Sequence, residues 1–131
     1  PHWGPNMRAE PVAHVRAAAA ELVAAGATLV AGHSAHVFQG VGGRVLFDLG
    51  ELVDDYAVDA ELRNDLGLLW LVTLDERGPQ RLEALPLELR YGHTRAARGD
   101  EARWVLQRFA ALCSALGTDV TTREGRAIVE W

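Results

Sequence analysis

The chain contains no lysine, one cysteine, one isoleucine and no long apolar run. All 13 basic residues are arginines and the formal net charge is -5, which excludes the basic stretches that neutralise phosphates in nucleic-acid binding. The single Cys113 cannot form an internal disulfide, and its helical context predicts a small core residue rather than a reactive thiol. No run approaches the roughly 20 apolar residues of a membrane span, and no signal peptide is visible. The residues themselves therefore predict a soluble chain.

The length of 131 residues and the hydrophobic content of 49% predict a single domain, residues 1–131, with its own core. Folding at this size buries roughly two thirds of the surface. The sequence has no internal repeat, no P-loop and no dinucleotide fingerprint. Because the chain begins at Pro1 and not at a methionine, we expect either that something upstream was removed or that this is a piece of a larger chain.

The rest of the chain is organised around the loop Gly32-His33-Ser34-Ala35-His36-Val37-Phe38-Gln39-Gly40. It follows an apolar run, residues 27–31, that predicts a short buried strand, and open α/β sheets bind ligands at the carboxyl ends of their strands. His33 and His36 can converge there on a metal ion, since imidazole is a common ligand of Zn, Mn and Fe. A third histidine, His2, lies at the far end of the intervening helix. The alternative interpretation is two surface histidines in a turn.

Two helices are predicted from three- and four-residue apolar spacing. The first opens at Glu10-Pro11 and ends at Gly26, with His14 off its apolar stripe and therefore exposed. The second is capped by Asp100 and ended by Gly117. The core face of the first comprises Val12, Val15, Ala19, Leu22 and Val23, and that of the second Trp104, Val105, Phe109, Leu112 and Leu116.

Three hairpins or strand pairs are predicted. The first joins residues 37–41 and 44–49 through a Gly42-Gly43 turn, and the last joins 118–122 and 126–131 through Glu124-Gly125. Between them, residues 66–74 predict a buried strand that turns at 75–78 into a second strand at 81–91. Pro86 predicts that this second strand is an edge strand or contains a bulge. His93 follows as a loop histidine.

The strand at 45–47 points its end at four carboxylates: Asp48, Glu51, Asp54 and Asp55. Close to a metal site, such groups can act as ligands or bases. The alternative is a solvated acidic loop in which a carboxylate caps a helical turn.

The motifs His2-Trp3-Gly4-Pro5-Asn6-Met7, Gly32 to Gly40, Arg44-Val45-Leu46-Phe47-Asp48-Leu49-Gly50 and Asp54-Asp55-Tyr56 carry a resemblance when taken together. In order and spacing they resemble the C-terminal half of CapA-like proteins, the capsule or poly-γ-glutamate biosynthesis proteins of the calcineurin-like metallophosphoesterase superfamily. The resemblance covers nearly the whole chain.

This resemblance implies the C-terminal part of a four-layer α/β/β/α metallophosphoesterase-like sandwich with two divalent metal ions, Mn, Fe or Zn, at the strand ends. The metal ligands map to His2, His33 and His36. Many relatives carry histidine at the place of Ser34. The family's earlier motifs, Asp-x-His, Gly-Asp and Gly-Asn-His, supply a bridging aspartate and an acid histidine and are expected before Pro1; this chain contains no Asp-x-His and no Gly-Asn-His.

The resemblance therefore predicts the C-terminal portion of a metal-dependent phosphoesterase-type hydrolase of capsule or poly-γ-glutamate synthesis. Its partner is expected to be the N-terminal half as a separate or cleaved chain, or a second copy through self-association that covers exposed strand edges. The alternative is a non-catalytic binding or assembly module of a capsule-synthesis complex, and a third is a small α/β protein whose histidines are structural. Relatives of this kind are often associated with the cell envelope.

Overall fold

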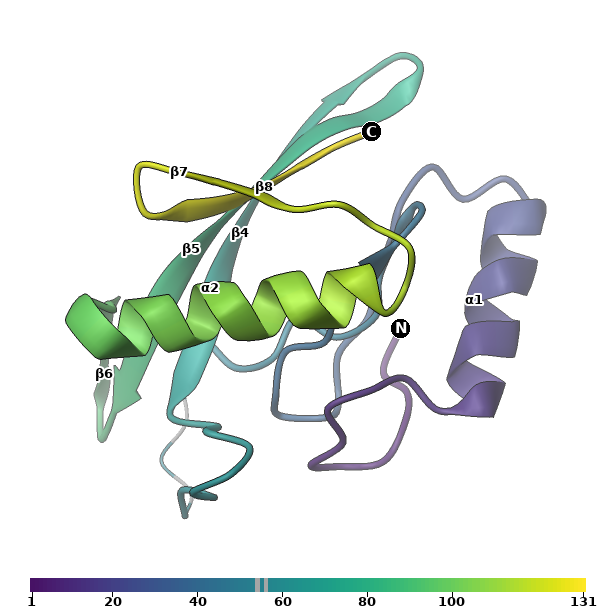
Figure 1. Ribbon diagram of the computed structural model, residues 1–131. Helices are drawn as coiled ribbons and strands as arrows, with labels where there is room; N and C mark the ends of the chain where they lie inside the picture. The colour runs from purple at the N-terminus through teal and green to yellow at the C-terminus, as the bar shows by residue number, and fades with distance from the viewer. Residues whose placement is uncertain (54, 56) are drawn as a thin grey trace.

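The computed structural model describes residues 1–53, 55 and 57–131, so the predicted motif residues Asp54 and Tyr56 lie outside it. Its helices and strands confirm the predicted mixed α/β class (Figure 1). In chain order they are α1 (Ala13–Ala24), β1 (Val30–Ala31), β2 (Val41–Gly42), β3 (Val45–Leu46), β4 (Leu66–Asp75), β5 (Gly78–Arg90), β6 (His93–Ala96), α2 (Gly99–Ser114), β7 (Thr121–Arg123) and β8 (Arg126–Glu130).

A small sheet with the strand order β1-β3-β2 carries the histidine loop. β1 runs parallel to β3, and β2 runs antiparallel to it. The predicted hairpin is confirmed and continues beyond the strands, because Phe38 pairs with Leu49 in the same register as Val41 with Leu46. Its turn lies one residue later than predicted, since Gly42 still pairs with Val45. The turn therefore falls at 43–44, where Gly43 takes a φ of 54° that glycine adopts without strain.

Helix α1 packs against this small sheet. Val15 and Ala19 on the helix are buried together with Val30, Val45 and Phe47 of the sheet region. The predicted helix is confirmed, and Gly26 follows it with a φ of 102°. Its predicted core face is confirmed at Val15 and Ala19 but is wrong at Leu22, which is 40% exposed. Neither described helix is long and apolar enough to cross a membrane.

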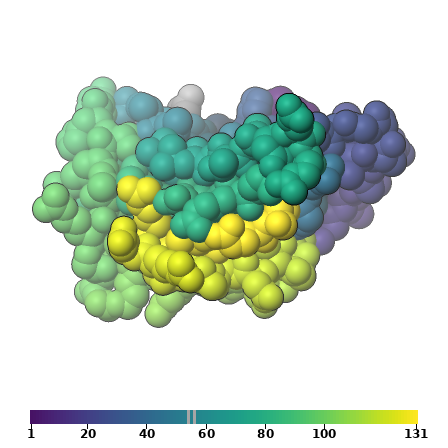
Figure 2. Space-filling model, turned by 90° about the horizontal axis from the view of Figure 1, so that it is seen from above, coloured from purple at the N-terminus to yellow at the C-terminus, as the bar shows by residue number. Residues whose placement is uncertain are grey.

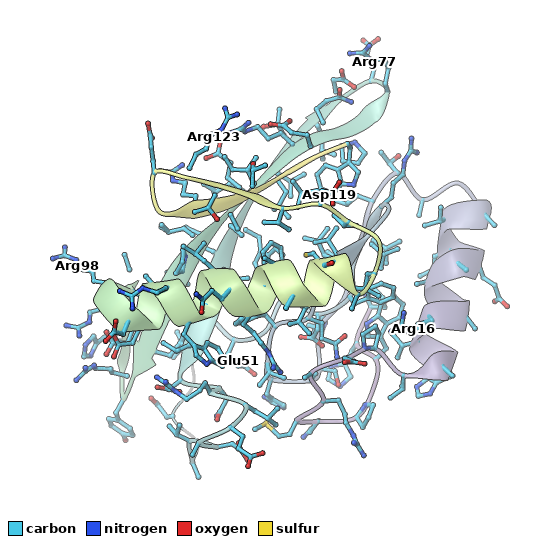
Figure 3. All side chains as sticks on the ribbon, in the orientation of Figure 1. Arg16, Glu51, Arg77, Arg98, Asp119 and Arg123 are labelled. Atoms are coloured by element: carbon cyan, nitrogen blue, oxygen red, sulfur yellow. The ribbon has the colours of Figure 1, made fainter. Side chains whose placement is uncertain are left out.

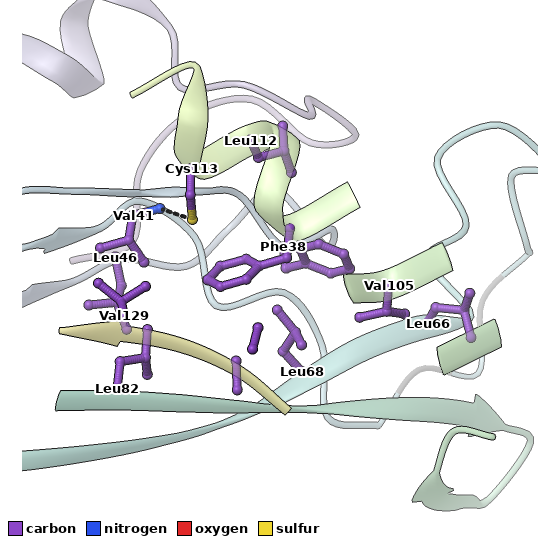
Figure 4. Packing of buried hydrophobic residues seen from close by; sticks show 13 residues of the cluster. Phe38, Val41, Leu46, Leu66, Leu68, Leu82, Val105, Leu112, Cys113 and Val129 are labelled. Carbon is purple, nitrogen blue, oxygen red and sulfur yellow. Dashed lines mark hydrogen bonds between the residues drawn. The ribbon is translucent and has the colours of Figure 1, made fainter. Parts of the chain in front are cut away.

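The larger sheet has the strand order β4-β5-β8-β7, with β6 also paired to β5. Helix α2 lies across one face of this sheet, and the main core fills the space between them (Figures 1 and 4). Phe109 and Val105 on the helix and Leu68 and Leu82 on the strands are fully buried there. Cys113 belongs to the same core and accepts a bond of 3.3 Å from the Val41 N–H, so its predicted core role is confirmed. Through this contact α2 also touches the small sheet.

The prediction that Pro86 lies in an edge strand or a bulge is wrong. β5 is the central strand of the larger sheet, and Pro86 pairs there with Leu68 of β4. On the other side of β5, β8 pairs with residues 81–84 and β6 with residues 87–90. Proline cannot donate a backbone hydrogen bond. Pro86 falls in the gap between these two strands, where its carbonyl accepts a bond of 2.9 Å from the Ala97 N–H.

Three smaller expectations also need correction. The strand at 66–74 is buried only at its beginning, and Leu71 and Leu74 further along are exposed. Asp100 lies in the first turn of α2 but makes no capping bond, since Arg98 holds the cap position. His93 is the first residue of β6 rather than a loop residue, and it is exposed, as is His14 on α1.

Candidate functional site

The two histidine motifs lie side by side because the N-terminal segment joins the edge of the small sheet. The His33 N–H donates to the Pro1 carbonyl and the Trp3 N–H donates to the His33 carbonyl, both at 3.0 Å. These bonds form a parallel bridge between His2 and His33, next to the end of β1. Residues 1–3 therefore occupy the place of a further strand parallel to β1.

Further contacts fix the two loops against each other. The Ser34 hydroxyl donates to the Gly4 carbonyl at 3.0 Å, so this side chain joins the loops. The indole N–H of Trp3 donates to the Phe47 carbonyl at 2.8 Å. Trp3 lies so close to Gly32 that a Cβ there would meet the indole nitrogen at 2.2 Å. Glycine is therefore required at the start of the loop for packing.

His2 and His33 converge on one point. Their Nδ1 atoms lie 3.3 Å apart and their rings meet edge to face at 67°, with centroids 4.9 Å apart. This contact brings together two ring nitrogens, one from each of the two histidine motifs. The sequence spacing alone did not predict it, since 31 residues separate the pair.

His36 faces a carboxylate. Its Nδ1 lies 2.5 Å from Oε1 of Glu51, and the two side chains are 33% and 28% exposed. His36 has a φ of 63°, in the left-handed region that few residues other than glycine adopt, and Ser34 has a φ of 136°. The loop is therefore held in a conformation that its own sequence does not favour, and the surrounding contacts maintain it.

Asp48 anchors the histidine loop through hydrogen bonds to its backbone. It is 1% exposed, and its two carboxylate oxygens accept bonds from the Ala35 N–H at 2.8 Å and the Gly50 N–H at 2.9 Å. Burial raises the pKa of Asp48, while these two bonds and the neighbouring His33 and His36 act in the opposite direction. Of the predicted carboxylates, Asp48 is therefore not part of a solvated loop. Asp55 accepts a bond from the Gly92 N–H, away from the histidines.

The three histidines line one open pocket of about 430 Å³. Its other walls come from the segment that follows β3, and Figure 3 shows Glu51 of this segment below α2. The complete lining is His2, His33, Ser34, His36, Gly50, Glu51, Leu52 and Val53.

A metal ion fits part of this arrangement. Two imidazole nitrogens on one tetrahedral ion, each about 2.0–2.1 Å from it, lie about 3.3–3.4 Å apart. The Nδ1 atoms of His2 and His33 have this separation. Yet within residues 1–53, 55 and 57–131, no three His, Cys, Asp or Glu side chains converge closely enough to hold an ion. The chain thus brings together two ligand groups, while His36 lines the same pocket and contacts Glu51.

Sequence reasoning named Asp48 and Glu51 only as members of an acidic group and did not separate their roles. One signal could have separated them: Asp48 directly follows the buried Val45-Leu46-Phe47 run, which favours a buried, hydrogen-bonded carboxylate over a solvated one. Trp3 was not identified as an anchor of the two loops. Its position before Gly4, in a segment rich in proline and glycine, gave no periodicity from which its contacts could be inferred.

Comparison with known proteins agrees with these motifs. Residues 1–56 match the family model of the bacterial capsule synthesis protein PGA_cap. Probable polyglutamine synthesis accessory proteins from two Mycobacterium tuberculosis strains, CDC 1551 / Oshkosh and ATCC 25618 / H37Rv, are each 28% identical to this chain over 131 residues. The match covers 93% of this chain and 34% of each relative, so the chain spans about a third of their length. The resemblance predicted from the histidine motifs is confirmed: the chain is similar to the bacterial capsule synthesis family over residues 1–56 and to these polyglutamine synthesis accessory proteins over most of its length.

Proposed function

We propose that this chain is the C-terminal portion of a metal-dependent, phosphoesterase-type hydrolase that acts in capsule or poly-γ-glutamate synthesis. Three of its five histidines, His2, His33 and His36, would hold divalent Mn, Fe or Zn. The observation that carries the proposal is the 3.3 Å separation of the His2 and His33 Nδ1 atoms across two distant loops. This separation fits two ligands on one ion, and in the absence of an ion it also allows a hydrogen bond between the two rings.

The surroundings of the pair support a binding role. The pocket that the three histidines line is open to solvent, and its volume of about 430 Å³ is large enough for a small anionic group. The Asp48 carboxylate holds the loop backbone at Ala35, one residue before His36. Such support is what a ligand set needs, because a metal site depends on side chains that are fixed before the ion binds.

Each residue has a distinct proposed role. His2 and His33 supply imidazole nitrogens to the same ion. Glu51 holds Nδ1 of His36 and thereby orients its ring, as a carboxylate does for a metal-binding histidine. When bound, two metal ions supply charge stabilisation and an activated water for attack on a phosphoester.

The site is proposed to need a second segment. Two ions about 3.5–4 Å apart require a bridging carboxylate to offset their repulsion. In CapA-like proteins that group comes from the earlier Asp-x-His, Gly-Asp and Gly-Asn-His motifs, and this sequence contains no Asp-x-His and no Gly-Asn-His. We propose that an N-terminal segment supplies them and completes a four-layer α/β/β/α sandwich. The bonds that align residues 1–3 beside β1 support this, since any preceding residues would continue along that edge of the small sheet.

A second candidate function is a non-catalytic binding or assembly module of a capsule-synthesis complex. One observation favours it: the described part of the chain brings together no three metal-binding side chains. A module of this kind would keep the fold and its histidine loop without needing an ion.

Phosphoester hydrolysis distinguishes the two candidates. The chain is purified alone and together with a co-expressed N-terminal segment that carries the three earlier motifs, and each sample is assayed on bis(4-nitrophenyl) phosphate with Mn²⁺ or Zn²⁺. We expect hydrolysis by the complex and none by the chain alone. His33→Ala should abolish the activity of the complex, whereas His14→Ala, which changes an exposed histidine on α1, should leave it unchanged.

Other outcomes would overturn parts of the proposal. Hydrolysis by the chain alone at a metal-dependent rate would show that no second segment is needed. A complex that binds metal but hydrolyses no phosphoester would exclude the phosphoesterase and favour the module.

A further inference from the structure

The strand β4 ends the larger sheet on one side. Among the strands that the structure describes, it pairs with β5 alone. Leu69, Leu71 and Leu74 of this strand are 37%, 45% and 54% exposed. In the view from above, the β4–β5 hairpin forms an exposed band beside β7 and β8 (Figure 2). A long apolar strand with an open edge is a template for pairing with another strand.

β4 lacks the usual features that prevent such pairing. Residues 66–74 contain no charged residue and no proline, and only a bulge between Thr73 and Leu74 interrupts the regular strand. At the start of the strand, the backbone of Glu51 lies so close to Gly67 that a Cβ there would meet its carbonyl at 2.7 Å. The segment open to a new partner is therefore residues 69–73.

The outer face of the sheet decides what kind of partner fits. Leu69 pairs with Leu85 on this face, but the next positions along β5 are Glu83 and Arg81. These two form ion pairs with Arg126 and Glu130 of β8. The apolar area is thus a narrow band along β4, which is too limited for a second sheet to pack face to face. It suits pairing at the strand edge.

We propose that β4 pairs antiparallel with β4 of a second copy of this chain, with Leu71 at the two-fold axis. This register places Trp70 opposite Val72 and Leu69 opposite Thr73, so every cross-strand pair in the segment is uncharged. Residues that face outward in one copy face outward in the other, which joins the two larger sheets into one. Asp75 lies opposite Gly67 and meets no like charge.

The second copy is the occupant because the segment is complementary to itself. A C₂ interface uses the same patch twice, and a symmetric register with apolar pairs on both sides of its centre meets that requirement. Edge pairing of this length buries less than the about 1,600 Å² of a standard interface, so we expect a dimer with micromolar affinity. This inference is independent of the proposed hydrolase activity and uses none of the histidine-pocket residues.

Sedimentation equilibrium over the micromolar range tests the proposal. The wild-type chain should dimerise, and Leu71→Lys should weaken the dimer at least about tenfold, because it sets two like charges directly opposite each other. The matched control is Leu22→Lys, which changes a leucine of similar exposure, 40%, on α1 and should dimerise as the wild type does. A mixture of Leu71→Lys and Leu71→Glu should recover the dimer through opposite charges at the axis.

Several results would overturn the inference. A wild type that stays monomeric throughout this range would leave the edge to a strand of another protein. A Leu71→Lys dimer as tight as that of Leu22→Lys would place the interface elsewhere. Hydrogen exchange on the wild type avoids any folding defect of the variants: amides of residues 69–73 should gain protection as the concentration rises, and unchanged exchange there would refute the pairing.

Discussion

Replacing Asp48 should weaken the fold at the histidine loop by an amount that the structure sets. Its carboxylate is 1% exposed and accepts two backbone N–H groups, one buried at Ala35 and one partly buried at Gly50. A buried donor left without a partner costs about 1–3 kcal/mol. Asparagine has one acceptor oxygen, which can stay with the buried Ala35 N–H, while its amide group faces the Gly50 N–H. Asp48→Asn should therefore lower the free energy of unfolding by about 1 kcal/mol.

Alanine at the same position removes both acceptors. Asp48→Ala should lower the free energy of unfolding by about 2–4 kcal/mol, the sum of two unpaired donors with the partly buried one at the low end of the range. The measurement is urea denaturation followed by tryptophan fluorescence, which the 4 tryptophans of the chain provide. Asp119→Asn, at an exposed position, is the control and should change the value by less than about 0.5 kcal/mol. An Asp48→Ala protein as stable as the control would refute the anchoring role.

Three further predictions concern the same core and loops. Because burial raises the pKa of Asp48 above its ordinary value of 3.8, the folded protein holds this proton more tightly than the unfolded chain. The free energy of unfolding of the wild type relative to Asp48→Asn should thus be greatest below pH 3.8 and fall as the pH rises through the pKa of the folded state. Urea denaturation at a series of pH values measures this difference, and a difference that rises with pH would contradict the prediction. Burial also raises the pKa of Cys113 to about 11, so Ellman's reagent at pH 8 should label the unfolded chain and leave the native thiol nearly unreacted. Gly40→Ala should lower the free energy of unfolding by about 1–3 kcal/mol, since its Cβ would meet the Leu112 carbonyl oxygen. The distance between the two atoms would be 2.5 Å. In the control Gly42→Ala, the new Cβ would have no neighbour closer than 3.2 Å, so this substitution should lower the free energy of unfolding less. Equal losses in thermal or urea unfolding would argue against this packing.

Local patterns predicted most of the secondary structure. The two helices and the first and last hairpins depend on apolar spacing, glycine positions and turns within a few residues, and the structure has each of them. The errors concern contacts between distant segments. Pro86 was assigned to an edge because the lengths of β6 and β8, which leave the gap beside it, are not visible in the local sequence.

β4 was predicted as buried for a related reason. An apolar run of this length is typical of a strand covered on both faces, and nothing in the sequence states that the sheet ends there. Leu71 is exposed because no described strand or helix covers its face of the sheet.

For the site, the sequence predicted where the histidine loop would lie but not what its residues would contact. His33 and His36 follow β1 as expected, yet only one of them meets His2, while the other contacts Glu51. The spacing of three residues between His33 and His36 does not determine this division, since it follows from the positive φ of Ser34 and His36 and from the bridge to residues 1–3. The similarity to bacterial capsule synthesis proteins, by contrast, was predicted from the motifs alone.

Zinc binding by the purified chain tests whether His2 and His33 converge on one ion. Isothermal titration with Zn²⁺ compares the wild type, His33→Ala and the control His14→Ala. We predict that His33→Ala weakens binding at least about tenfold, as the loss of one of two ligands to a shared ion should, and that His14→Ala binds as the wild type does. Equal Zn²⁺ affinity in all three proteins would contradict the account.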